Sequence, residues 1–144
     1  MASGLYGVTF LNALNNDLAL DLDDTTADRF KVMLVTSAYT PDFGTHDFKA
    51  DVTNEVTGTG YTAGGESLTS VTLTQSGGTI TWDAADVTWA SSTITARGAV
   101  VYDDSLASDP LICYIDFGSD QSSTSGDFTL SFNASGIFTL DLTP

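Results

Sequence analysis

The sequence is poor in the residues that brace or anchor many small proteins. It has one cysteine, Cys113, in 144 residues, so the chain forms no internal disulfide. No apolar run approaches the roughly 18 residues that a membrane-spanning helix needs, and the N-terminal residues carry no basic region typical of a secretory signal. We therefore expect a protein that is made in a reducing cytoplasm and has no membrane partner.

Positive charge is also scarce. Four basic residues stand against 19 acidic ones, which gives a net charge of -15. A surface of this sign repels phosphate groups, so we expect no nucleic-acid partner. Nearly all of the acidic residues are Asp rather than Glu. Asp favours turns and caps whereas Glu suits helix interiors, so the composition favours strands joined by many turns.

The pattern of apolar residues predicts strands along most of the chain. Residues 30–36 predict a strand that is apolar on both faces towards its end, which is typical of a central strand. Gly77 and Gly78 form a two-residue hairpin signal. Further short strands are predicted at 67–74, 79–82, 86–89, 93–102, 111–117, 127–133 and 137–142. We therefore predict a single all-β domain over residues 1–144, an antiparallel β-sandwich or partly open barrel with at most one or two short helices.

Two segments depart from the strand pattern. Apolar residues recur at helical spacing near the N-terminus, so residues 1–16 are predicted to form an arm or a short helix. Residues 39–52 form a polar excursion in which Thr45 is placed to cap one helical turn. Both segments carry large apolar side chains that a β-core has little room for. We predict that they contact a partner through Leu5, Tyr6, Val8, Phe10, Leu11, Tyr39, Phe43 and Phe48. The alternative is that these side chains pack back on the end of the sandwich.

The sequence offers weak matches to two kinds of active site. Residues 58–63 have the letter pattern of a dinucleotide-binding loop, but a β-rich run follows where that site needs a helix. His46 is the only histidine, and no serine stands in a nucleophile-elbow motif. We expect no catalytic residue, no cofactor site and no enzymatic activity. A pair of carboxylates suited to glycoside hydrolysis stays open as an alternative.

Acidic clusters raise the question of a metal. The clusters at 21–24, 83–86 and 103–104 lack the ligand spacing and terminal Glu of a calcium-binding loop. We therefore predict no metal site, with a cation trapped between loops as the alternative. Trp82 and Trp89 lie on predicted strands, which favours core packing over a sugar platform. Arg97 is expected to pair with a nearby aspartate on a sheet face.

Several stretches together are similar to a family of small tailed-bacteriophage virion proteins. They are residues 30–36, 39–41, 46–48, 60–65, 90–104, 111–118 and 136–140. The resemblance implies a non-enzymatic capsid decoration (cement) protein on the exterior of the virion. It also implies the major capsid protein as partner and a homo-oligomer, with a trimer favoured. The alternative is a tail, collar or fibre-associated component or a glycan-binding adhesin.

Overall fold

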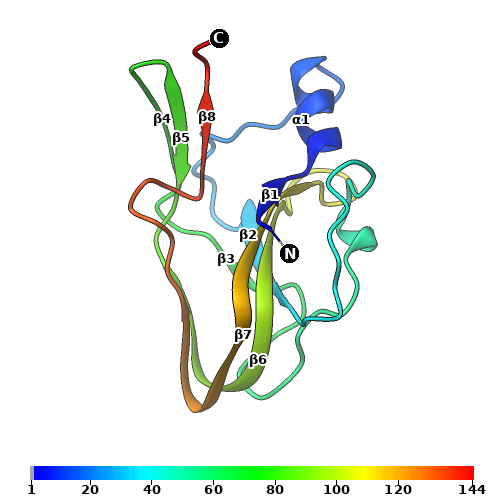
Figure 1. Ribbon diagram of the computed structural model, residues 1–144, viewed down its shortest axis with the longest axis vertical. Helices are drawn as coiled ribbons and strands as arrows, with labels where there is room; N and C mark the ends of the chain where they lie inside the picture. The colour runs from blue at the N-terminus through cyan, green and yellow to red at the C-terminus, as the bar shows by residue number, and fades with distance from the viewer. Residues whose placement is uncertain (1) are drawn as a thin grey trace.

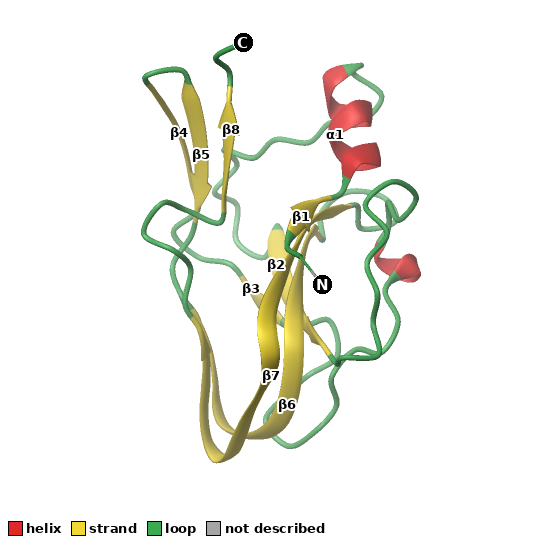
Figure 2. Ribbon diagram, in the orientation of Figure 1, coloured by secondary structure: helices red, strands yellow, loops and turns green. Residues whose placement is uncertain are grey.

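The computed structural model describes residues 2–144 and shows two antiparallel sheets packed as a β-sandwich (Figure 1). Met1, the first residue of the predicted arm and domain, lies outside the described residues. In chain order the elements are β1 (Gly4–Leu5), α1 (Gly7–Leu14), β2 (Phe30–Val35), the 3-10 turn η1 (Lys49–Asp51), β3 (Glu66–Ser67), β4 (Thr72–Ser76), β5 (Thr79–Asp83), β6 (Val87–Asp103), β7 (Leu111–Leu130) and β8 (Phe138–Asp141). The first sheet has the order β1-β7-β6-β2-β3, and the second has the order β4-β5-β8. The all-β prediction is confirmed (Figure 2).

A long hairpin of β6 and β7 forms the centre of the fold. The sequence predicts four short strands here, but the structure joins them into two strands of 17 and 20 residues. Register shifts replace the predicted turns, because bulges bend paired strands without ending them. Figure 1 shows the hairpin folding over at the lower end of the molecule, so that the start of β6 and the end of β7 run back toward β5 and β8.

Serine hydroxyls stabilise the bend of this hairpin. Ser91 and Ser125 have φ angles of 50° and 48°, in the left-handed region. Ser92 is fully buried, and its Oγ lies 2.7 Å from Ser123 Oγ and 3.1 Å from the carbonyl oxygen of Gly126. The buried hydroxyl of Ser92 therefore finds its hydrogen-bond partners within the bend itself.

The core occupies both faces of the first sheet. Between the sheets, Phe30 meets Trp82 at 5.2 Å between ring centroids, and the Trp82 indole donates to the carbonyl oxygen of Leu22 at 2.9 Å. The opposite face carries a second cluster, against which Phe43 and Val52 pack. Its members are Tyr6, Met33, Val35, Tyr39, Val100, Tyr102, Leu111 and Tyr114. β2 therefore has buried side chains on both faces, as predicted for a central strand.

An ion pair at the end of β6 is enclosed by the fold. Asp103 is fully buried, and its Oδ2 accepts from Nε of Arg29 at 3.1 Å and lies 2.9 Å from Nη2. Its Oδ1 accepts from the backbone N–H and the hydroxyl of Ser105 at 2.9 Å and 2.6 Å. Both oxygens of the Asp103 carboxylate thus have hydrogen-bond donors, as a buried carboxylate requires.

We expect Asp103→Ala to lower the free energy of unfolding by about 3 kcal/mol, because it removes the fully buried one of the two carboxylates that pair with Arg29 and leaves only Asp24, at 2.7 Å. The matched control is Asp120→Ala, which breaks the 2.9 Å pair with Arg97 on the surface and should cost below about 1 kcal/mol. Urea unfolding followed by circular dichroism measures both. Equal losses in the two variants would contradict the structural role of Asp103.

Candidate interaction surface

The glycine-rich loop has a structural role beside β2. Glu55 Oε1 accepts from the hydroxyl of Tyr61 at 2.7 Å and from the N–H of Gly64 at 2.6 Å. The Tyr61 hydroxyl in turn accepts from the backbone N–H of Leu34 at 2.9 Å. β3 follows the loop at Glu66, so no helix N-terminus faces it. The loop closes the side of the sheet and lacks the geometry of a phosphate site.

We expect Gly65→Ala to prevent stable folding or to lower the free energy of unfolding by more than about 3 kcal/mol. At φ +76° a Cβ on Gly65 would stand 1.8 Å from the carbonyl oxygen of Val32. Gly77→Ala is the control, since its φ is +57° and a Cβ there meets nothing within 4 Å. The control should cost only about 1 kcal/mol. Thermal unfolding of both variants measures the difference. A Gly65→Ala variant that is as stable as Gly77→Ala would contradict the close approach of Gly65 to Val32.

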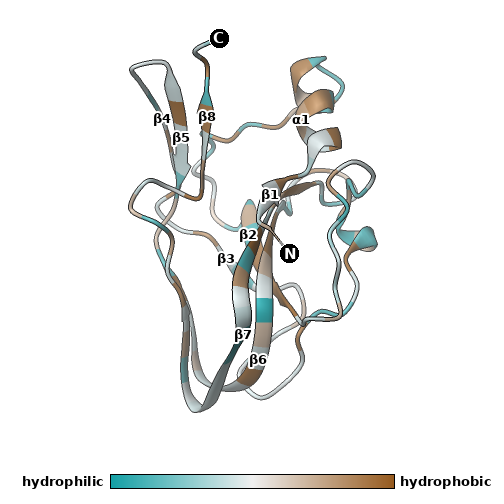
Figure 3. Ribbon diagram, viewed as in Figure 1, coloured by the Kyte–Doolittle hydropathy of each residue, from teal (hydrophilic) through white to brown (hydrophobic). Residues whose placement is uncertain are grey.

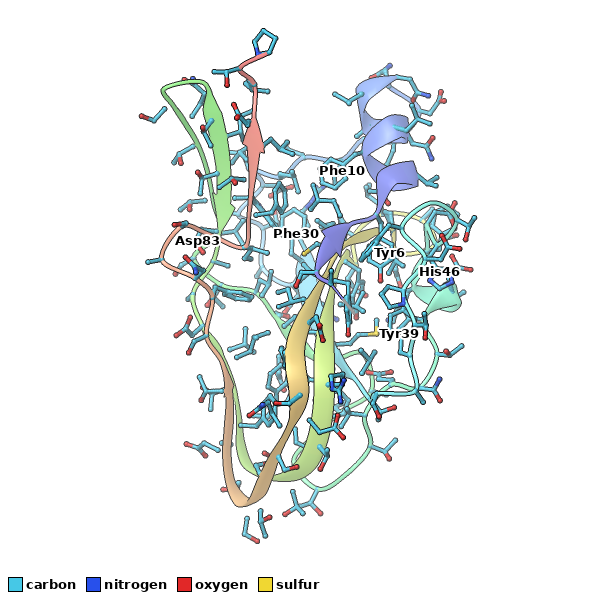
Figure 4. The ribbon with its side chains drawn as sticks, in the orientation of Figure 1. Tyr6, Phe10, Phe30, Tyr39, His46 and Asp83 are labelled. Atoms are coloured by element: carbon cyan, nitrogen blue, oxygen red, sulfur yellow. The ribbon has the colours of Figure 1, made fainter. Side chains whose placement is uncertain are left out.

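His46 fixes the polar excursion on the sheet. Its Nδ1 accepts from the backbone N–H of Asp42 at 3.3 Å, so the Tyr39 hydroxyl, 3.1 Å away, is the donor in the second contact. Tyr39 then accepts from the Tyr6 hydroxyl at 2.8 Å. Figure 4 shows these three side chains together on one flank. Burial raises the pKa of both tyrosines, so they stay neutral and serve as hydrogen-bond partners.

Thr45 does not cap the helical turn of the excursion, which corrects the sequence prediction. The turn η1 begins at Lys49. Its cap is the carboxylate of Asp51, which accepts from the N–H groups of Asp47 and Phe48 at 3.0 Å each. These bonds hold the pKa of Asp51 below its usual range.

The remaining candidates for chemistry are also structural. Among residues 2–144, no group of three or more His, Cys, Asp or Glu side chains is placed to hold a metal ion. Burial raises the pKa of the Cys113 thiol to about 12, so little thiolate forms near neutral pH. Trp82 and Trp89 are buried in the core, and Arg97 pairs with Asp120, which confirms both of these predictions.

The predicted interface residues divide into three groups. Tyr6 and Tyr39 are buried, so they belong to the core and offer no free surface. Five are half-buried, namely Leu5, Val8, Phe10, Phe43 and Phe48. Leu11 is 62% exposed. The N-terminal segment is therefore not a free arm, because β1 pairs with β7 and α1 packs on the sandwich. That these residues contact a partner stays a prediction.

One end of the molecule carries the exposed apolar side chains. Within the described part of the chain, the exposed large hydrophobic residues are Leu11, Leu14 and Leu142, at 62%, 87% and 56%. Figure 1 shows α1 and the segment after β8 at the same end, and Figure 3 colours α1 as largely hydrophobic. The rings of Phe10 and Phe138 meet edge-to-face at 5.7 Å and join the two elements. We call Leu11, Leu14 and Leu142 the apolar end.

The last strand continues this apolar surface. Side chains alternate along a strand, so Phe138, Leu140 and Leu142 share one face of the second sheet, while Thr139 and Asp141 share the other. Leu140 is half-buried and Leu142 is exposed, so the apolar side chains on this face become more exposed toward the C-terminus. Sequence reasoning missed Leu14 and Leu142 as surface residues, although the apolar alternation after Phe138 was a visible signal.

The few positive charges of the chain are paired with carboxylates. Each of the four basic side chains lies within 4 Å of a carboxylate, and these side chains are Arg29, Lys31, Lys49 and Arg97. The closest contact of Lys31 is Asp104 at 2.7 Å. The positive charge is thus neutralised internally, which leaves the surface strongly acidic at a net charge of -15.

In the part of the chain that the structure describes, no helix is both long and apolar enough to cross a bilayer. Comparison with protein-family models, with curated proteins and with solved structures finds no match to this chain.

Proposed function

We propose that this chain is a non-enzymatic structural virion protein that decorates and stabilises the outer surface of a bacteriophage capsid. The observation that carries the proposal is the confinement of the exposed large apolar side chains to one end of an acidic β-sandwich. Its partner is the major capsid protein. The capsid context comes from the resemblance of the separate stretches named in the sequence analysis to tailed-bacteriophage virion proteins.

The physical features suit a cement. Burying an exposed leucine against a shell contributes about 2 kcal/mol, so Leu11 and Leu14 together supply a useful share of an attachment energy. The acidic remainder faces outward and keeps finished particles from adhering to one another. Attachment of this kind requires a rigid domain whose side chains pack against the shell. It requires no covalent bond to be made or broken.

A trimer on the three-fold positions of the shell completes the proposal. Copies with a charge of -15 repel one another in solution, so the shell itself brings them together. Sedimentation of the free protein and of protein released from particles distinguishes assembly in solution from assembly on the shell.

We expect the double variant Leu11→Asn and Leu14→Asn to stay folded and to lose at least about tenfold in affinity for undecorated shells, since two anchors become polar. Asn12→Ala, on the same helix, is the matched control and should bind as the wild type. Co-sedimentation with purified shells, followed by gel densitometry, measures the occupancy.

Full occupancy by the double variant would contradict the role of α1 in attachment. The number of copies per particle tests the capsid assignment separately. Hundreds of copies fit decoration, whereas a handful would favour the tail, collar or fibre alternative.

A further inference from the structure

A hollow opens between β7 and the start of β8. Its volume is about 300 Å³. One wall comes from β1 and the adjoining part of β7, and the other comes from the residues that lead into β8. Its apolar lining consists of Leu5, Cys113, Ile115, Phe132, Ile137 and Phe138. All of these except Cys113 are half-buried, so the hollow is an incompletely covered part of the core.

The edge of β8 next to this hollow has unpaired backbone groups. Among the described residues, β8 pairs with β5 and with no second strand. The N–H of Leu142 donates to Gly78 at 2.7 Å, toward β5. Because amide direction alternates along a strand, the N–H groups of Thr139 and Asp141 point away from β5.

The facing edge of β7 is closed by contrast. The N–H of Asp116 donates to Ser3 Oγ at 2.9 Å, and the N–H of Gly118 donates to the Asp116 carboxylate at 3.1 Å. Side chains thus occupy the amides that another strand would use, a common protection of sheet edges. β4, the other edge of the second sheet, is exposed at four of its five positions and offers little apolar cover.

We infer that β8 accepts an extended segment of a partner protein as an added strand. The segment continues the second sheet through the backbone groups of Thr139 and Asp141. Its inward side chains are apolar, since they meet the hollow and the face of Phe138 and Leu140. Its outward side chains are basic or neutral, because Asp83 and Asp141 lie on the outer face of the sheet.

A second copy of this chain fits the edge poorly. Pairing β8 with another β8 brings two acidic chains together and places Asp141 of each copy near the same acidic face. Like charges on neighbouring strands destabilise pairing. The inference rests on the proposed function, since it describes the kind of segment through which the capsid protein would bind β8. Binding of such a segment can be tested with a peptide, without a shell.

The probe is a nine-residue synthetic peptide in which valine alternates with lysine or threonine, and its counterpart carries glutamate in place of lysine. Titration into the 15N-labelled protein should shift the amide signals of Thr139 and Asp141 and slow their hydrogen exchange. Thr139→Pro removes the outward N–H at an exposed position, while Thr139→Ala keeps it. We expect the Pro variant to bind at least about fivefold more weakly and the Ala variant to stay within about twofold of the wild type.

The glutamate peptide should also bind at least about fivefold more weakly, because it brings negative charge beside Asp141 and toward a chain of net charge -15. Wild-type binding by a folded Thr139→Pro variant, no preference for lysine, or the absence of shifts at β8 would each overturn the inference. If the free protein forms a dimer in which hydrogen exchange of the Thr139 amide is slowed, a second copy of the chain occupies the edge of β8. That result would also overturn the inference. If the Thr139→Pro variant unfolds, hydrogen exchange of the Thr139 amide in the wild type is the test. Exchange that the lysine peptide does not slow would then overturn the inference. Peptide binding at β8 without decoration of shells would refute the proposed function alone.

Discussion

The fold depends on the bend of the β6–β7 hairpin, because this ribbon forms the centre of the first sheet and is joined along the chain to β5 and β8 of the second sheet. The bend lets Trp89 and Phe128 pack at 6.0 Å, while Phe117 from the other half of β7 meets Phe128 at 6.3 Å. The loop before β3 closes this end, since Thr93 donates to the carbonyl oxygen of Thr59 at 2.9 Å. At the opposite end lie α1, β8 and the β4–β5 hairpin (Figure 1). Leu11 and Leu14 of α1 and Leu142 after β8 are exposed.

Local patterns predicted those elements whose cause is local. The apolar run at 30–36 predicted β2, and Gly77 and Gly78 predicted the β4–β5 turn, where their φ angles are 57° and 81°. The long hairpin was predicted as four strands for an equally physical reason. Serine and glycine at 91–92 and 118–126 are typical of turns in sequence, yet here they form bulges that keep the two strands paired.

The interaction surface was harder to predict because burial is decided between distant segments. Tyr6 and Leu11 looked alike as apolar residues of one arm. Tyr6 is buried because its hydroxyl meets Tyr39, which lies 33 positions later, whereas Leu11 projects from the outer side of α1. Likewise, the unpaired edge of β8 follows from the strand order of the second sheet, which no local pattern contains. Sequence alone indicated the right segment but not which of its side chains face solvent.

The scarcity of basic residues sets the chemistry that a partner must supply. Three of the four cations gather near the turn after β6, where Arg29 meets Asp103, and Lys31 and Lys49 approach Asp104. They neutralise an acidic turn that would otherwise repel itself next to the core, and little positive charge is left for contacts outside the chain. Anionic ligands are therefore disfavoured over the whole surface. The partner that we propose would gain affinity by burying the leucines of the apolar end and by carrying positive charge toward a chain of net charge -15.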